Sequence, residues 1–394
     1  MRRIPLVTLF AVLGACAGGS GNPDAGVAPK TYDDYAPRFI AALCTAQLRC
    51  NIVSSLAECE KALTTFFTVD SSGNPSPKSM VAKSLAKGRA AYDSQAALNC
   101  LASLTTASCD VIAGSQTYPP ACAAAIAGKV ASGGSCFQAY ECSPDSFCTS
   151  ASRLDSAASG CPGSCASRSG DGTTTQYAAG CATGLYTYGS GGVRTCRAPT
   201  HRLQSCAPVA PGTQKLTCVE SAYCENDTCV ARKPAGDMCG SDAECVAGTF
   251  CQAGACGPLL ALDQACARSG AQATRCRLYS VCLPSTRTST TGTCQVPGVE
   301  GSNCIATSDC ASGFQCLGAT ANEFGKCAAL KGKDGACNVL TGSPGCAAGF
   351  FCNLSNVCQE RKPFGSGCLV GVECLSGVCT NLTCASTSTC IDPS

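Results

Sequence analysis

The chain has 394 residues, with 28 basic and 26 acidic side chains, one histidine, no tryptophan and 39 cysteines. This near balance of charge gives no electrostatic basis for binding nucleic acid or an anionic surface. Cysteine makes up about a tenth of the chain, which is typical of a disulfide scaffold in an oxidising compartment. The composition therefore predicts an exported, disulfide-rich protein and excludes nucleic acid as an expected partner.

The N-terminal segments follow one another in the order that is typical of an export signal. Two arginines precede an apolar run, Ile4 to Leu13, which is too short to span a bilayer. The run ends in Leu-Gly-Ala-Cys, with the cysteine at Cys16, and this motif resembles the lipobox of bacterial lipoproteins. The resemblance implies a signal peptide over residues 1–15 and a palmitate-type lipid on Cys16. Because Ala17 follows the cysteine, it also implies the outer membrane; the alternative is an ordinary secretory signal cleaved nearby.

Beyond Cys16, no segment has the 18 uninterrupted apolar residues that a membrane span needs. We therefore expect membrane attachment only through the lipid on Cys16, with the rest of the chain outside the membrane. Residues 16–30 are rich in Gly, Ala and Pro and suit a flexible tether between the lipid and the folded part.

Residues 31–130 are predicted to form a small disulfide-bonded α-helical domain. Phe39, Ile40, Leu43 and Leu48 fall near helical spacing, and Ser55-Leu56-Ala57-Glu58 fits a capping box that opens a second helix. Residues 76–104 are rich in Ala, Lys and Leu and suit one or two more helices. Six cysteines lie here, enough for three disulfides in any of fifteen connectivities: Cys44, Cys50, Cys59, Cys100, Cys109 and Cys122.

Residues 131–390 read as about eight tandem repeats of about 33 residues, followed by a tail at 391–394. The units are aligned on their first cysteines, namely Cys136, Cys165, Cys206, Cys239, Cys266, Cys304, Cys337 and Cys368. A glycine recurs three residues after the second cysteine, which predicts a turn with positive φ at Gly184, Gly248, Gly313, Gly349 and Gly377. An aromatic residue often precedes the third cysteine and is expected to form the apolar plug of its unit: Phe147, Tyr223, Phe250 and Phe351.

A unit of about 33 residues buries too little surface to fold unaided, whereas a disulfide that closes a loop of ~15 residues contributes roughly 3 kcal/mol. We therefore predict a small disulfide-rich fold, in which the helical domain is followed by an elongated tandem array of small Cys-rich β-hairpin and loop modules. The clearest scaffold cysteines of the array are Cys136, Cys142, Cys148, Cys161, Cys239, Cys245, Cys251, Cys256, Cys304, Cys310, Cys316, Cys327, Cys368, Cys374, Cys379 and Cys384.

Two cysteines do not fit this repeat pattern. In the unit that opens at Cys165, Thr187 takes the place of the third cysteine, which leaves one sulfur of that unit without its usual partner. Cys390 stands outside every unit. The two odd cysteines either pair across the molecule, or Cys390 bonds to another chain.

Metal and catalytic chemistry are both disfavoured by the sequence. The chain contains no C-x2-C, and its tightest gap is the C-x3-C of Cys161 and Cys165, so zinc and thioredoxin-like redox motifs are missing. Ser241-Asp242 with Glu244, and Ser308-Asp309, lack a calcium-binding loop pattern and are read as solvated turns. The single histidine, His201, lies in a polar segment, and no G-x-S-x-G or P-loop pattern occurs. We expect no metal, no cofactor and no enzyme activity.

Two resemblances extend this interpretation. CGSDAECVAGTFCQAGAC at 239–256 resembles the N-terminal cysteine-rich motif of Dickkopf proteins, and the unit at Cys304 repeats much of it. EGF modules fit less well, because their C-x-C step is absent. The whole layout, from the lipobox through the helical segment to the repeats, is similar to cysteine-rich lipoproteins of gliding, predatory bacteria, which implies location more than activity.

Together these features predict a lipid-anchored, extracytoplasmic repeat protein that binds a protein or glycan ligand, in adhesion or as a structural part of the cell envelope. The alternative is a regulator of another exported protein, such as a hydrolase inhibitor, that uses the same disulfide-bonded loops.

Overall fold

The structure is a computed structural model that describes residues 27–68, 77–113, 120–149, 163–177, 179–189, 192–209, 214–268, 275–311, 313–338, 345–347, 349–362, 365–374 and 379–384. It is disulfide-rich, with helices in the N-terminal part and many small antiparallel hairpin sheets after it. None of the helices in these residues combines the length and the hydropathy that a membrane-spanning segment requires.

The N-terminal part contains α1 (Tyr32–Arg49), α2 (Leu56–Thr68), α3 (Pro77–Ala86), α4 (Ser94–Thr106), α5 (Cys109–Ala113) and α6 (Pro120–Ala123). It also contains a two-stranded antiparallel sheet, β1 (Ala90–Tyr92) with β2 (Ile126–Gly128), which the sequence did not predict. This sheet joins the start of α4 to the first repeat and so places the array beside the helices.

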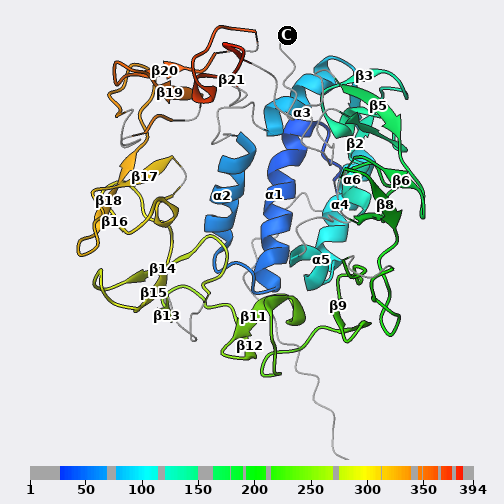
Figure 1. Ribbon diagram of the computed structural model, residues 1–394, viewed down its shortest axis with the longest axis horizontal. Helices are drawn as coiled ribbons and strands as arrows, with labels where there is room; N and C mark the ends of the chain where they lie inside the picture. The colour runs from blue at the N-terminus through cyan, green and yellow to red at the C-terminus, as the bar shows by residue number, and fades with distance from the viewer. Residues whose placement is uncertain are drawn as a thin grey trace, which may run out of the picture.

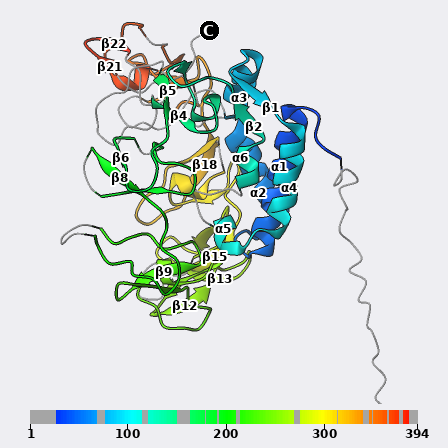
Figure 2. The same ribbon diagram turned by 90° about the vertical axis from the view of Figure 1, so that its right-hand side faces the viewer.

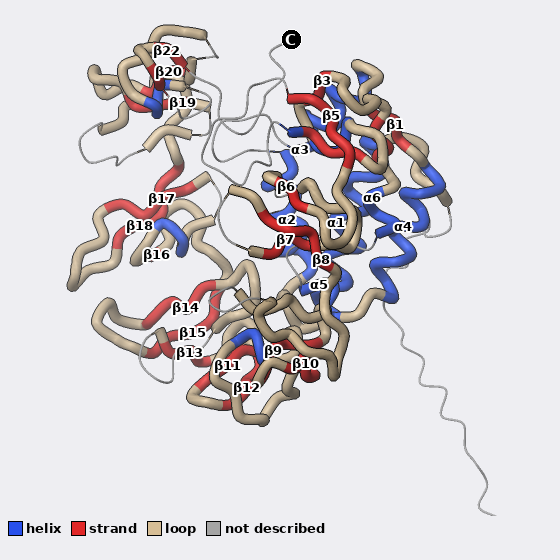
Figure 3. The backbone as a smooth tube through the Cα atoms, turned by 45° about the vertical axis from the view of Figure 1, so that its right-hand side comes forward, coloured by secondary structure: helices blue, strands red, loops and turns tan. Residues whose placement is uncertain are grey.

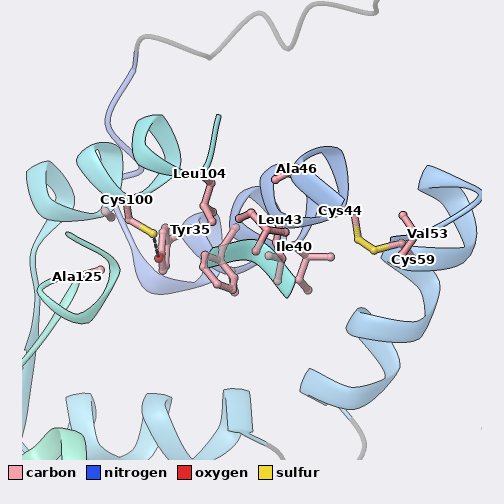
Figure 4. Close-up of a cluster of buried hydrophobic side chains, with 14 of the residues drawn as sticks. Tyr35, Ile40, Leu43, Cys44, Ala46, Val53, Cys59, Cys100, Leu104 and Ala125 are labelled. Atoms are coloured by element: carbon pink, nitrogen blue, oxygen red, sulfur yellow. Dashed lines mark hydrogen bonds between the residues drawn. A yellow bond between two sulfur atoms is a disulfide. The ribbon is translucent and has the colours of Figure 1, made fainter. Parts of the chain in front are cut away.

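Helix α1 supplies more residues to the buried cluster of this part than any other helix (Figure 4). Thr31 caps its first turn by accepting a hydrogen bond from the N–H of Asp34. Phe39, Ile40 and Leu43 are buried, as their helical spacing predicts, whereas Leu48 is 38% exposed and lies outside the cluster.

Three disulfides connect the helices. Cys44 bonds Cys59 between α1 and α2, Cys50 at the end of α1 bonds Cys109 at the start of α5, and Cys100 bonds Cys122 between α4 and α6. Ser55 accepts the N–H of Glu58 at the start of α2, as the capping-box pattern predicts. The three closed loops restrict the unfolded chain, each by roughly 3 kcal/mol or more.

After β2 come eight modules, numbered here 1 to 8: residues 130–168, 169–199, 200–232, 233–259, 260–297, 298–330, 331–361 and 362–384. Their strands are β3 (Ser135–Cys136), β4 (Ser146–Cys148) and β5 (Gly163–Ser167) in module 1; β6 (Thr174–Thr175), β7 (Tyr186–Tyr188) and β8 (Arg194–Arg197) in module 2; β9 (Ala222–Glu225) and β10 (Thr228–Ala231) in module 3; and β11 (Thr249–Gln252) and β12 (Ala255–Pro258) in module 4.

The second half of the array continues in the same way. It contains β13 (Ala265–Ala267), β14 (Val281–Pro284) and β15 (Thr291–Gln295) in module 5; β16 (Asn303–Cys304), β17 (Phe314–Leu317) and β18 (Gly325–Ala329) in module 6; β19 (Phe350–Cys352) and β20 (Cys358–Glu360) in module 7; and β21 (Cys379–Thr380) and β22 (Thr383–Cys384) in module 8.

The modules follow one another in an arc rather than in an elongated array. Figure 1 shows them in chain order around α1 and α2, and Figure 2 shows the helices as a layer against one side of this arc. The array bends back because distant modules contact the helical part. The N–H of Leu278 in module 5 donates to the carbonyl of Ile52 at 2.8 Å, and Arg277 contacts the Asn51 side chain at 3.2 Å. The predicted elongated shape is therefore wrong.

Candidate binding surface

Each module is built on one hairpin with a fixed disulfide pattern. Its third and fourth cysteine positions face each other across the hairpin, as Cys251 and Cys256 do in module 4. They are not bonded to each other: the first position bonds the third, and the second bonds the fourth. This crossed pattern holds in every module except module 2, which has only the second bond.

The structure changes the predicted boundary between the first two modules. Cys142 bonds Cys165, so Cys165 is the fourth cysteine of module 1 and does not open a new unit. Module 2 instead has Thr175 at its first cysteine position and Thr187 at its third, and it keeps only the bond between Cys181 and Cys196. The prediction went wrong because it assigned the fourth position of module 1 to Cys161, the earlier of two nearby cysteines.

A second repeated contact identifies the module register independently of the disulfides. The residue six positions before the first cysteine position forms an isolated parallel bridge with the second cysteine in all eight modules, for example Lys233 with Cys245. In module 2 this bridge joins Ser169 to Cys181, which again places Thr175 at the first position.

All 36 cysteines in the part of the chain that the structure describes are paired in 18 disulfides. Of the chain's 39 cysteines, three lie outside these residues: Cys16, which is predicted to carry the lipid, Cys161 and Cys390.

The sulfurs themselves form the interior of the modules. In module 6 the buried cluster consists of Cys304, Cys310 and Cys327, with Phe314 and Cys316 packed against it. Three sulfurs in several modules lie within 4.8 Å of one another, a spacing that would suit a metal ion. Because each of these sulfurs is in a disulfide, none offers the thiolate that a metal binds.

The aromatic residues before the third cysteine position are buried, and three of the four contact a side chain of the next module. The ring centroids of Phe147 in module 1 and Tyr177 in module 2 are 5.2 Å apart. Lys233 of module 4 lies over the ring of Tyr223 in module 3, and Arg275 of module 5 lies over Phe250 of module 4.

Positive φ angles occur at two fixed places in the repeat. Gly184, Gly248, Gly313 and Gly349 have φ between 79° and 89°, as their offset from the second cysteine predicts; Gly377 lies outside the described residues. A second position, three residues before the first cysteine position, also has positive φ in every module. It is occupied by Gly in five modules, by Asp263 and Asp334 in two, and by Leu203 in one. Its N–H donates to the carbonyl of the fourth cysteine, which closes the module.

An acidic side chain precedes the second cysteine in four modules and fixes the loop between the first two cysteines. Glu141, Glu244, Asp309 and Glu373 occupy this position. Asp309 accepts the N–H groups of Ile305 at 2.7 Å and Ala306 at 3.0 Å. These carboxylates are part of the loop's hydrogen bonding. Asp309 is buried, so its interpretation as part of a solvated turn is wrong, whereas the 3₁₀ turn Asp242–Glu244 contains no buried residue.

In modules 4 and 8 the same carboxylate also pairs with the lysine that begins the module. The Lys233 Nζ lies 2.7 Å from Glu244 Oε2, and the Lys362 Nζ lies 2.6 Å from Glu373 Oε2. Hydrogen bonding to the lysine lowers the pKa of each carboxyl group. In module 1 the partner is Arg89, which comes from the helical part and lies 2.8 Å from Glu141 Oε1.

Around this constant frame, the loops differ in length. The first and second cysteine positions are separated by five residues in module 4, by nine in module 5 and by eleven in module 3. The third and fourth are separated by four residues in module 4 and by ten in module 6. His201 is exposed, and its N–H donates to the Gln204 side chain.

Module 8 carries an exposed apolar group that the sequence interpretation did not identify, called here the terminal patch: Leu369, Val370, Val372 and Leu382. These side chains are 69%, 53%, 57% and 67% exposed, respectively. The N–H of Cys368 donates to the carbonyl of Leu382, which places Leu382 beside the loop that carries the other three. Figure 3 shows this module at one end of the arc.

No family model, curated protein or solved structure matches this chain.

Proposed function

We propose that this chain is an exported, non-catalytic binding protein that is held at the outer membrane by a lipid on Cys16. The repetition of one crossed-disulfide frame with loops of different lengths supports this proposal most directly. A disulfide frame keeps loops in place without a large core, and preorganised loops lose less entropy on binding. The ligand is a protein or glycan of the cell envelope or of a neighbouring cell.

A loop-shortening experiment tests the binding role. In the variant, residues 285–291 of module 5 and 318–325 of module 6, which lie between the last paired residues of each hairpin, are each replaced by Asn-Gly, which suits a two-residue hairpin turn. We expect fluorescently labelled mature chain to bind isolated envelopes saturably, and the loop-shortened variant to bind at least tenfold more weakly while resisting thiol alkylation like the parent. Equal binding by both forms, or no saturable binding by either, would count against loop-mediated recognition.

The anchor has a separate test. Cys16→Ser removes the thiol that the lipid would modify, so we expect the protein to move from the detergent-extracted membrane fraction to the soluble extracytoplasmic fraction. Intact mass of the parent should show a lipid-sized increment that the variant lacks. If both forms remain in the membrane fraction at the same mass, Cys16 is not the anchor.

A further inference from the structure

The hairpins of the array end in two different ways. In modules 3, 4 and 8 only a two-residue turn separates the last paired residues of the two strands. In modules 5 and 6 the strands are instead joined by longer connections, residues 285–291 and 318–325. Because the same crossed-disulfide frame closes with a two-residue turn elsewhere, the fold of a module does not require these longer connections.

The two long connections belong to neighbouring modules and meet. The Arg287 Nε donates to the carbonyl of Thr320 at 3.0 Å, and the 3₁₀ turn Thr307–Asp309 of module 6 lies against β14 of module 5. Figure 1 shows β14 and β15 next to β17 and β18 at the left edge of the molecule. Residues 285–291 and 318–325 therefore form one surface, called here the composite surface.

Both parts of the composite surface are ordered by their own hydrogen bonds. The N–H of Ser289 donates to the carbonyl of Thr286 at 3.1 Å, which forms a turn in the module 5 connection. In the module 6 connection, Thr320 Oγ1 accepts the N–H groups of Asn322 at 3.3 Å and Glu323 at 3.0 Å. Connections that are already ordered lose less entropy when they bind a ligand.

The helical part also holds the module 5 hairpin in place through Tyr279. Glycine occupies the same repeat position in modules 2, 4, 6 and 7, and Tyr279 keeps a positive φ of 58° there, which is unfavourable for a bulky side chain. The side chain packs against the buried cluster of the helices, and β14 begins two residues later. Backbone strain of this kind is found where the surrounding structure enforces it, most often near functional sites.

The exposed side chains of the composite surface are polar. Every exposed residue among 285–291 is a serine or a threonine, and the module 6 connection adds Thr320, Asn322 and Glu323. No large apolar side chain is exposed on either connection, since Phe324 is half-buried. Protein interfaces depend on a few large buried anchors, above all aromatic residues, and none is offered here. Hydroxyl and amide groups instead both donate and accept hydrogen bonds, as the hydroxyl groups of a sugar require.

Arg287 adds a directional donor at the centre of the composite surface. It is half-buried and is fixed through its Nε by Thr320, whereas its terminal N–H groups have no acceptor among the described residues. A fixed, planar guanidinium can donate to two adjacent oxygen atoms at once. Neighbouring hydroxyl groups or a carboxylate on a sugar ring present oxygen atoms in this way.

We propose that the composite surface binds a glycan and that Arg287 is a specificity-determining residue for it. This inference rests on the proposed binding function and names the ligand class for the loops of modules 5 and 6.

The first test treats isolated envelopes before labelled mature chain is added. Periodate cleaves carbon–carbon bonds between adjacent hydroxyl groups and so destroys glycans, and borohydride then removes the aldehydes. We expect this treatment to weaken binding of the chain at least tenfold. Envelopes digested with proteinase K, which is inactivated before the chain is added, should bind it as untreated envelopes do.

Matched variants locate the binding to the composite surface. Arg287→Ala should weaken envelope binding at least tenfold, whereas Arg202→Ala, which removes an exposed arginine of module 3, should leave it unchanged. Arg287→Lys keeps the charge but loses the planar guanidinium, so it should restore little of the binding. Resistance of each variant to alkylation before reduction verifies its folding.

Several outcomes would overturn the proposal. Binding that proteinase K abolishes and periodate spares would assign the composite surface to a protein ligand, and binding that survives both treatments would assign it to lipid. Periodate-sensitive binding that Arg287→Ala leaves unchanged would place the glycan site elsewhere. The binding function itself fails only if the parent shows no saturable binding or the loop-shortened variant binds equally, so the two failures are distinguishable.

Discussion

At the scale of single residues, Glu141 links the helical part to the first module. Its side chain is fully buried, and it accepts hydrogen bonds from the Phe137 N–H, the Ser84 hydroxyl and Arg89. Burial by itself would raise the pKa of this carboxyl group, but these donors outweigh burial, and the net effect is a lowered pKa. The charged form is therefore the one that the folded protein stabilises.

Replacing this carboxylate is predicted to destabilise the protein. Glu141→Gln keeps the size of the side chain but removes the buried charge that pairs with the partly buried Arg89, so we expect a loss of about 2–3 kcal/mol in the free energy of unfolding. Urea denaturation followed by circular dichroism would measure it, with the exposed Glu300→Gln as a control that should change little. A loss below about 0.5 kcal/mol, the level of a surface substitution, would show that this pair does not hold the module.

The same group predicts a pH dependence. Because the pKa of Glu141 is lower in the folded chain than its ordinary value of 4.5, its contribution to stability is present above that value and is lost as the pH falls through the folded pKa. The free energy of unfolding of the parent should therefore fall more steeply than that of Glu141→Gln as the pH is lowered below about 4.5. Parallel pH profiles of the two proteins would contradict this assignment.

At the scale of elements, module 2 differs from its neighbours because it holds one disulfide where they hold two. Thr175 and Thr187 occupy the positions that cysteines take elsewhere, and the strands that carry them keep the register of the other modules. Module 2 is therefore the least covalently restricted unit of the array.

Restoring the missing bond should stabilise this module. In the double variant Thr175→Cys with Thr187→Cys we expect spontaneous formation of a disulfide, and a gain of up to about 3 kcal/mol for a loop of this length. Differential scanning calorimetry should show a higher melting temperature, whereas Thr175→Ser with Thr187→Ser should show none. Free thiols in the folded double variant would mean that the two positions do not face each other as they do in the other modules.

Much of the module structure could be predicted from the sequence, and each error has a physical cause. Cysteine spacing indicated the repeat and its length, because a disulfide frame constrains which residues can occur at fixed positions. It did not indicate that Cys165 closes module 1, since both Cys161 and Cys165 fit the spacing and only the hairpin decides which one faces Cys148. The contacts of Phe147, Tyr223 and Phe250 with the next module were not predicted, because a residue buried within a module and one buried between modules look alike in the sequence.

At the scale of the whole molecule, cysteine counting makes a further prediction. Cys16, Cys161 and Cys390 are the cysteines outside the 18 described disulfides, and the first is predicted to carry the lipid. Complete pairing then joins Cys161 to Cys390, which would connect module 1 to the segment that follows module 8. Module 8 and module 1 lie at the same end of the molecule (Figure 1).

Alkylation and mass spectrometry can check this pairing. The native protein should resist alkylation and take up 38 labels after reduction, and Cys390→Ser should leave one thiol, Cys161, that reacts without reduction. Peptide mapping of the parent should find the two cysteines in one disulfide-linked fragment. If Cys390 instead appears in a fragment from two chains, the protein is a covalent dimer.

By itself, the sequence determined that this is a disulfide-rich chain with helices followed by small hairpin modules, because cysteine spacing and apolar periodicity are local patterns. Only the tertiary structure decided the curvature of the array, the crossed pairing of its sulfurs and the exposure of the terminal patch. These depend on contacts between residues far apart in the chain, such as Ile52 with Leu278, and no local pattern reports which surfaces meet and which remain in water.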